Sequence, residues 1–215
     1  MTTLITIHSQ KGGSAKSTLA ANLYIACMQD GIPSAILDLD PQASITQRFD
    51  KRTQTIMDLS YGDVPRTMSI DKVFDQVKKT HKEIIFLDTE PRSTERYQEL
   101  ACFSDLIVVP VRPTVVDLEA VGNTYAILKN AGSLDRTVFV ITQAASKRGM
   151  CENPDVIEAQ AVLEQYGLTL APTIIRNRLD YSRSLNDGRG VLEASPHSKA
   201  ADEIRGLWNT IKERI

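Results

Sequence analysis

Short apolar runs alternate along the chain with longer stretches in which apolar residues recur at helical spacing. The runs are rich in β-branched residues and are bounded by turns, which is typical of strands buried on both faces of a parallel sheet. The expected strands are residues 4–8, 35–39, 84–87, 106–111, 138–142 and 170–175. The expected helices are residues 18–29, 71–79, 94–103, 116–130, 154–166 and 199–214. This alternation predicts a doubly wound, mainly parallel α/β sheet flanked by helices.

Composition adds limits to this picture. At 215 residues the chain is long enough to bury a substantial core, and we expect a single domain over residues 1–215. The 25 basic and 27 acidic residues nearly balance, so any site for nucleic acid or membrane must be a local patch. The three cysteines are widely spaced, which argues against a metal cluster and favours a reducing compartment. We expect a cytoplasmic protein, because no signal peptide or membrane-spanning run is visible.

A glycine-rich segment stands between the first expected strand and the first expected helix. Residues 10–18 read Gln-Lys-Gly-Gly-Ser-Ala-Lys-Ser-Thr. Glycines let backbone N–H groups turn around a phosphate, and the following helix directs its positive dipole end at the same anion. A strand, a glycine-rich turn and a helix in this order form the P-loop of nucleoside triphosphatases, so we expect ATP with Mg²⁺ as the ligand. The candidate phosphate-binding residues are Lys11, Gly12, Gly13, Ser14, Ala15, Lys16, Ser17 and Thr18.

Three positions in this loop carry separate expectations. Lys16 can reach the β- and γ-phosphates, and the Ser17 hydroxyl can ligate Mg²⁺. Ala15 stands where the standard pattern has glycine, so we expect that position to have a negative φ angle and room for one methyl group.

Carboxylates follow two of the expected strands. Asp38 and Asp40 lie at the end of the second expected strand, and Asp88 lies at the end of the third. In P-loop proteins an aspartate in such a position commonly lies near the bound Mg²⁺. Functional groups in such sheets lie beyond the carboxyl ends of the strands. A helix N-cap or a turn is the alternative role for the residues around Asp38 and Asp40.

The sequences of these segments resemble the motifs of the ParA/MinD family of deviant Walker A ATPases. Lys-Gly-Gly-x-x-Lys-Ser-Thr at residues 11–18 matches the family's double-lysine box, and Asp-x-Asp-Pro-Gln at residues 38–42 matches a second family box. The chain looks like a compact ParA-type protein. Two departures stand out: Ala15 replaces glycine, and Glu90 replaces the first proline of the family's Asp-Thr-Pro-Pro.

The resemblance implies roles for particular residues. Lys11 would reach across a dimer interface to the partner's nucleotide, with Lys16 and Asp40 completing the catalytic set. Asp38, Asp88 and Ser17 would lie on the Mg²⁺ side. Gln143 and Arg176 would contact the nucleotide, although Gln143 can equally be an ordinary polar residue after a strand.

The C-terminal part of the chain is locally basic. Residues 176–215 contain eight lysines and arginines against six acids. A phosphate-contacting stripe is expected at Arg176, Arg178, Arg183 and Arg189. A solvated, salt-bridged surface is the alternative, and the C-terminal apolar stripe is expected to pack on the sheet rather than on a membrane.

The expected function is therefore a ParA-like ATPase that dimerises with ATP, binds non-specific DNA on the nucleoid and positions a cargo. A stimulating adaptor or centromere-binding protein would complete the cycle. A MinD-like ATPase at the membrane surface and a metabolic P-loop enzyme that activates a small substrate remain the alternatives.

Overall fold

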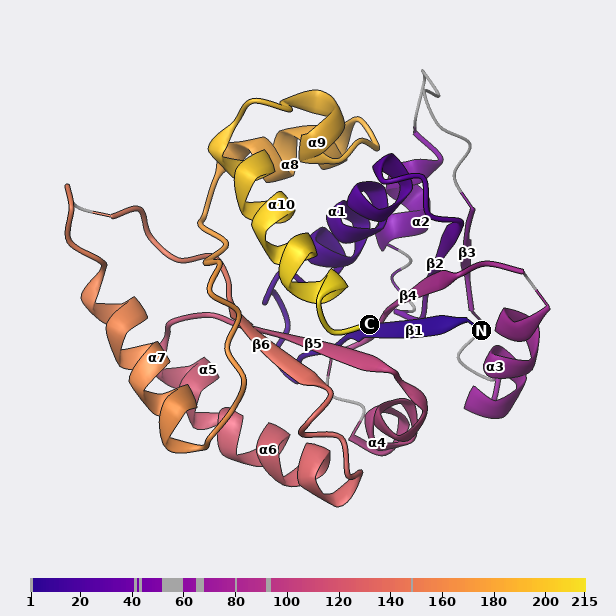
Figure 1. Cartoon of the computed structure of the whole chain (residues 1–215), viewed down its shortest axis with the longest axis horizontal. Coiled ribbons are helices and arrows are strands. Elements are labelled where there is room, and N and C mark those ends of the chain that lie inside the picture. Colours follow the sequence, from indigo (N-terminus) through magenta and orange to yellow (C-terminus); the bar gives the residue numbers. More distant parts are fainter. Residues whose placement is uncertain are drawn as a thin grey trace.

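A single parallel sheet forms the centre of the computed structural model. The structure describes residues 2–40, 42, 44–51, 60–64, 68–79, 81–91, 94–147 and 149–215. Six strands pair in the order β3-β2-β4-β1-β5-β6, and every pairing is parallel. Their bounds are β1 Thr3–Ile7, β2 Ser34–Asp38, β3 Tyr61–Asp63, β4 Ile84–Asp88, β5 Leu106–Val111 and β6 Thr137–Ile141. The prediction of a doubly wound sheet is confirmed (Figure 1).

One face of the sheet is covered by the first helix and by the C-terminal part of the chain. Side chains that point to this face, such as Ile5 and Phe86, pack against these helices in one apolar cluster. The helices are α1 Lys16–Gln29, α2 Ser44–Phe49, α8 Leu179–Asn186, α9 Val191–Ala194 and α10 Lys199–Lys212. The apolar side chains of α10 are buried in this cluster, so the expected packing of the C-terminal helix on the sheet is confirmed.

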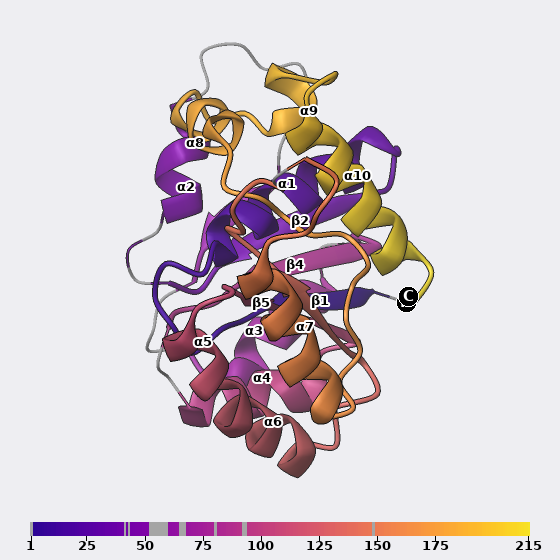
Figure 2. The same cartoon turned by 90° about the vertical axis from the view of Figure 1, so that its left-hand side faces the viewer.

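The opposite face is covered by helices from the middle of the chain. Alternate strand residues, such as Leu4 and Val109, pack there in two further clusters. The helices are α3 Ile70–Lys78, α4 Thr94–Phe103, α5 Val115–Glu119, α6 Val121–Asn130 and α7 Pro154–Gln165. Figure 2 shows the resulting three layers, with α1 and α10 on one side of the sheet and α4 and α6 on the other.

Two expected elements differ from the structure. The segment at 170–175 is not a strand: it meets β6 at an isolated bridge from Leu170, and its Ala171 and Ile175 N–H groups donate to the Phe139 and Ile141 carbonyls at 2.8 and 2.9 Å. Between these two hydrogen bonds the segment advances four residues while β6 advances two, so the register slips and no continuous ladder forms. The expected helix at 116–130 is divided between α5 and α6 at Ala120.

Several short elements were missed because their apolar patterns are too brief to detect. These are α2, β3, α8 and α9. Among the described residues, no helix is long and apolar enough to cross a membrane.

Candidate nucleotide-binding site

The glycine-rich segment connects the end of β1 to the start of α1 at the carboxyl edge of the sheet. Gly13 has φ 74° and Ala15 has φ 71°, so both residues lie in the left-handed region. The expectation of a negative φ angle at Ala15 is therefore wrong. The loop requires at this position the backbone conformation that glycine normally supplies, and alanine adopts it against the steric preference of its Cβ.

Lys16 begins α1 and is almost completely buried. Its Nζ donates to the Lys11 carbonyl at 3.2 Å, and the Ser14 hydroxyl donates to the same oxygen at 3.2 Å. Burial lowers the pKa of the Lys16 amine, whereas the carboxylates of Asp88 and Asp40 act in the opposite direction. The amine is thus held inside the loop, where a phosphate can replace the carbonyl as its partner.

The last residues of β2 and β4, Asp38 and Asp88, lie directly opposite each other in the parallel ladder. The carboxylate of Asp38 accepts hydrogen bonds from the backbone N–H groups of Asp40 at 3.1 Å and Ile45 at 3.0 Å. Asp38 therefore performs the capping role that the sequence left open, because it anchors the turn after β2 and the start of α2. Its assignment to the Mg²⁺ side stays a prediction.

Asp88 is fully buried, and neither carboxylate oxygen has a hydrogen bond of normal geometry with the described residues. Burial raises its pKa to about 8, although the nearby Ser17 hydroxyl acts to lower it. A buried carboxylate without donors is unfavourable unless a cation neutralises it. Carboxylate and hydroxyl oxygens are the donors that Mg²⁺ prefers. Asp88 and Ser17 therefore fit a magnesium ion.

A cavity of about 330 Å³ opens beside these groups. It is lined by Lys16, Ser17 and Asp40, among other residues. The Asp40 carboxylate accepts from the Gln42 N–H at 3.0 Å, which holds the side chain in a local turn. Pro41, which completes the Asp-Pro-Gln box, lies outside the described residues. The cavity brings most of the expected phosphate-binding residues together with Asp40, whereas Lys11 and Ser14 do not line it.

The end of β6 supports the loop from the other side. The Thr142 hydroxyl donates to the Ser14 carbonyl at 3.1 Å, and the Gln143 amide donates to the Gly13 carbonyl. Gln143 has a positive φ of 52° and lines the phosphate cavity. The structure thus places Gln143 at the glycine-rich loop, and its expected contact with the nucleotide base stays a prediction.

A second cavity of about 300 Å³ adjoins the first and shares Ala15, Thr18, Arg48, Gln143 and Leu185 with it. Arg48, on α2, is the one basic side chain that lines both cavities among the described residues, and its Nη1 donates to Asn186 of α8 at 3.4 Å. The sequence does not indicate this role, because Arg48 lies in a polar stretch of mixed charge that is typical of a solvated helix face. Its position suits an anionic ligand.

The four arginines expected to form a DNA-contacting stripe do not share one exposed surface. Arg176 is buried and binds Glu152 at 2.7 Å and the Ala145 carbonyl at 2.6 Å. Arg178 binds Glu203 at 2.6 Å. Both guanidinium groups have internal partners, which favours the alternative of a salt-bridged surface for these two residues; their contact with DNA stays a prediction.

Two of the four arginines remain accessible. Arg183 is exposed on α8 and has no ion pair with the described residues. Arg189 is partly exposed and pairs with Asp187 at 3.2 Å. The local positive surface is therefore smaller than the sequence analysis predicted.

A further basic side chain missed by the sequence analysis stands beside the loop. Arg112 follows β5 and forms a salt bridge to the buried Asp117 at 2.9 Å. Its Nη1 is 3.6 Å from the position that a Cβ on Gly13 would occupy. Its positive charge contributes to the lowered pKa of Lys16. The basic character of the loop thus extends beyond its own two lysines.

Comparison with known proteins agrees with this geometry. Residues 5–191 match the model of the CobQ/CobB/MinD/ParA nucleotide binding domain. The Halothiobacillus neapolitanus protein "Maintenance of carboxysome distribution protein A" is 22% identical over 215 residues, which cover 96% of this chain and 95% of the relative. The protein ParA of Rhizobium radiobacter is 26% identical over 122 residues, which cover 53% of this chain and 50% of the relative.

The fold also matches solved structures. The septum site-determining protein MinD of Pyrococcus horikoshii, complexed with Mg-ADP, superposes with a TM-score of 0.70 at 17% identity. The match covers 98% of this chain and 96% of that one. The two proteins therefore share the fold.

Proposed function

The chain belongs to the CobQ/CobB/MinD/ParA nucleotide-binding family, and from this premise we propose that it is a ParA-like positioning ATPase. In the proposal, binding of ATP and Mg²⁺ produces a dimer in which two nucleotides lie between two subunits. The dimer binds non-specific DNA on the nucleoid in the cytoplasm. An adaptor or centromere-binding partner stimulates hydrolysis, and the cycle positions a cargo such as a plasmid or a protein assembly.

The different positions of the two lysines of the glycine-rich loop are the observation that best supports the proposal. Lys16 lines the phosphate cavity near Asp88 and Asp40. Lys11 is not among the described residues that line this cavity, and its amine has no hydrogen bond or ion pair within the described part of the chain. One lysine thus serves the subunit's own nucleotide, and the other is free to meet a second subunit.

The residues of the cavity support hydrolysis in a simple division of roles. Magnesium, when bound, would neutralise charge on the β- and γ-phosphates, and Asp88 and Ser17 would hold it. Lys16 and the first N–H groups of α1 bind the phosphates. Asp40 lies at the cavity wall, where its carboxylate can orient the attacking water.

Binding of random-sequence duplex DNA tests the proposal. It is measured with ATP, with ADP and without nucleotide, over a series of salt concentrations. We expect binding only with ATP and a steep loss of affinity with salt, because released counterions drive such binding. A Lys11→Glu variant should keep its fold and lose both the ATP-dependent dimer and DNA binding, since repulsion replaces the contact with the partner's phosphates.

The contrary results are equally specific. An ATP-dependent dimer that persists in the Lys11→Glu variant, as measured by light scattering, would overturn the assigned role of Lys11. ATP hydrolysis without DNA binding in any nucleotide state would overturn the DNA-carrier role. Anionic vesicles would then test action at a membrane surface, and turnover by a monomer would indicate a metabolic enzyme.

A further inference from the structure

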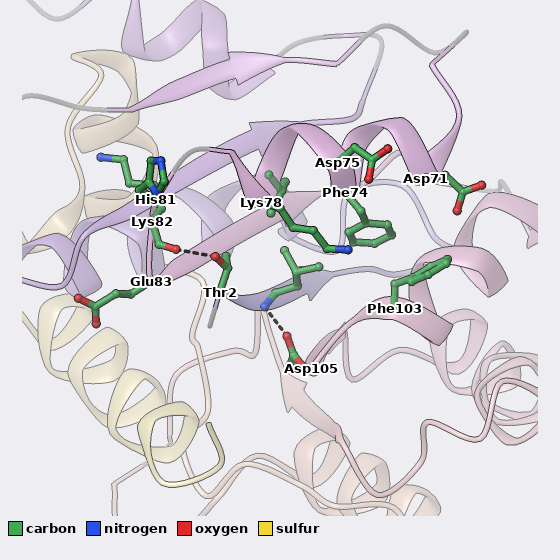
Figure 3. Close-up of a pocket in the computed structure, with 12 residues that line it drawn as sticks. Thr2, Asp71, Phe74, Asp75, Lys78, His81, Lys82, Glu83, Phe103 and Asp105 are labelled. Carbon is green, nitrogen blue, oxygen red and sulfur yellow. Dashed lines mark hydrogen bonds between the residues drawn. The ribbon is translucent and has the colours of Figure 1, made fainter.

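A second groove lies at the amino edge of the sheet, opposite the glycine-rich loop. Its volume is about 710 Å³. The walls come from the start of β1, from α3, from the turn before β4 at 81–83 and from the residues 103–105 before β5 (Figure 3). The groove shares no lining residue with either nucleotide cavity, so a ligand can occupy it while the nucleotide is bound.

The backbone around the groove is held by hydrogen bonds between segments far apart in sequence. The Thr2 hydroxyl donates to the Lys82 carbonyl at 2.8 Å, and the Leu4 N–H donates to the Asp105 carboxylate at 2.8 Å. Both bonds are drawn in Figure 3. The Asp105 N–H returns a bond to the Leu4 carbonyl at 3.0 Å. The groove is therefore formed before any ligand arrives, which lowers the entropic cost of binding.

Two aromatic rings form an apolar surface at one end of the groove. Phe74 of α3 and Phe103 at the end of α4 have ring centroids 4.5 Å apart. Phe74 is buried, but Phe103 is 49% exposed. A large ring that is half in solvent beside a concave surface offers apolar area that a partner can cover.

Carboxylates surround the same end of the groove. Figure 3 shows Asp71 and Asp75 on the side of the two phenylalanines, and the amine of Lys78 directed toward Phe74. Asp71 and Asp75 are exposed one helical turn apart and have no ion pair with the described residues. Over the whole groove, four carboxylates (Asp71, Asp75, Glu83 and Asp105) outnumber two lysines (Lys78 and Lys82). This balance opposes phosphate and nucleic acid and attracts a cation.

We propose that the groove binds a segment of a partner protein that carries lysine or arginine next to an aromatic or long aliphatic side chain. The apolar side chain packs on Phe103, and the neighbouring cation meets the Asp71 and Asp75 carboxylates. A cation near the Phe103 ring face gains a further attraction. Aromatic and arginine side chains are also those that concentrate at protein interfaces.

The groove is a separate site from the nucleotide cavities, so its test does not depend on the proposed ATPase cycle. The probe is a fluorescein-labelled peptide Gly-Ser-Lys-Trp-Lys-Ser-Gly, with one matched peptide in which glutamate replaces lysine and another in which alanine replaces tryptophan. Binding is followed by anisotropy and by shifts of backbone amide signals. We expect saturable binding below about 1 mM, with shifts at α3 and at residues 103–105, and weaker binding of both matched peptides.

Variants of the groove locate the binding. Asp71→Lys with Asp75→Lys should weaken the affinity for the probe at least about tenfold, since two attractive carboxylates become repulsive. Glu158→Lys with Glu164→Lys makes the same charge change at exposed positions of α7 and should leave the affinity unchanged. Phe103→Ala should also weaken binding, and thermal unfolding checks that each variant is folded.

Several results would overturn the proposal. They are the absence of saturable binding, equal affinity in the groove variants and the wild type, and equal binding of the glutamate peptide. Displacement of the probe by duplex DNA or ATP, with amide shifts at the glycine-rich loop, would show that the peptide binds the nucleotide site instead.

Discussion

Ala15 shows how the backbone requirement of a loop can override the preference of a residue. At φ 71° its Cβ crowds the following carbonyl oxygen, which costs roughly 1 kcal/mol in an L-residue. The residue is the N-cap of α1 and its side chain offers no cap hydrogen bond. The strain is retained because the loop conformation presents the first N–H groups of α1 to the phosphate cavity.

Replacement of Ala15 by glycine should therefore stabilise the nucleotide-free protein by about 1 kcal/mol, because glycine adopts a positive φ without the Cβ clash. Urea unfolding followed by circular dichroism measures the difference. Gly13→Ala is the matched control: Gly13 has φ 74°, and an added Cβ there meets Arg112 only at 3.6 Å. The Gly13→Ala variant should lose about the same free energy of unfolding, because only the positive φ angle, and no steric clash, disfavours alanine there. A loss of stability in Ala15→Gly would contradict this explanation.

At the scale of elements, α2 and α8 meet over the two nucleotide cavities. They are joined by the hydrogen bond from Arg48 to Asn186, which is long at 3.4 Å. Asp38 caps the start of α2 through the Ile45 N–H. The position of Arg48 thus depends on two short helices that come from distant parts of the chain.

Truncation of this side chain should weaken nucleotide binding. Arg48→Ala is expected to raise the Kd for ADP about tenfold, in keeping with the loss of one charge-assisted hydrogen bond of about 1.5 kcal/mol. Titration with a fluorescent ADP analogue measures the effect. Arg183→Ala removes an exposed arginine from α8 outside both cavities and should leave the Kd unchanged. Equal affinity in Arg48→Ala and the wild type would show that Arg48 does not contact the nucleotide.

The pair of Arg176 and Glu152 joins the segment after the irregular run at 170–175 to the loop before α7. Hydrogen bonding from Arg176 lowers the pKa of the Glu152 carboxyl to about 2, from an ordinary value of 4.5. Because the folded pKa is below the unfolded one, the pair contributes its full stability above about pH 4.5 and loses it as the pH falls through about 2.

Glu152→Gln should accordingly reduce the free energy of unfolding by about 2 kcal/mol near neutral pH, since the buried guanidinium of Arg176 loses its charged partner. The difference from the wild type should shrink as the pH falls toward about 3. Urea unfolding at several pH values checks both statements. Asp187→Asn removes the exposed partner of Arg189 and should change stability by less than about 0.5 kcal/mol. A pH-independent difference would assign the effect of Glu152→Gln to packing instead of charge.

At the scale of the whole molecule, the parallel sheet separates two kinds of surface. Its carboxyl edge carries the glycine-rich loop after β1, Asp38 and Asp88 at the ends of β2 and β4, and Gln143 after β6. Its amino edge carries the groove with the exposed Phe103 ring. The proposed nucleotide site and the proposed partner groove therefore lie at opposite edges of one sheet.

The sequence predicted the elements whose patterns are local and long. Five of the six expected strands and the long helices α1, α4, α7 and α10 are confirmed, because their apolar periodicity is continuous. The sixth expected strand was wrong because a run of apolar residues does not show that the segment loses register with β6 after Ala171. The missed helices α2, α8 and α9 have four to eight residues, so their burial depends on neighbours far away in the chain.

The candidate site divides in the same way. The candidate phosphate-binding residues could be predicted because the chemistry requires particular residue types at fixed spacing within one loop. The surroundings of Arg48, Arg112 and Arg176 could not be predicted. The residues next to them in sequence do not show which acid or cavity each arginine faces. The number of basic residues along the chain predicted an arginine stripe, whereas three of its four members form ion pairs in the folded structure.

The sequence by itself determined the succession of the long strands and helices, the glycine-rich loop with its two lysines, and the aspartates that end two strands. These features depend on backbone periodicity and on chemistry confined to a few consecutive residues. The tertiary structure alone decided the positive φ of Ala15, the burial of Asp88 without donors, the internal pairing of Arg176 and Arg178, and the groove at the amino edge. Each of these depends on contacts between segments distant in sequence, which form only when the sheet and its two helical layers pack together.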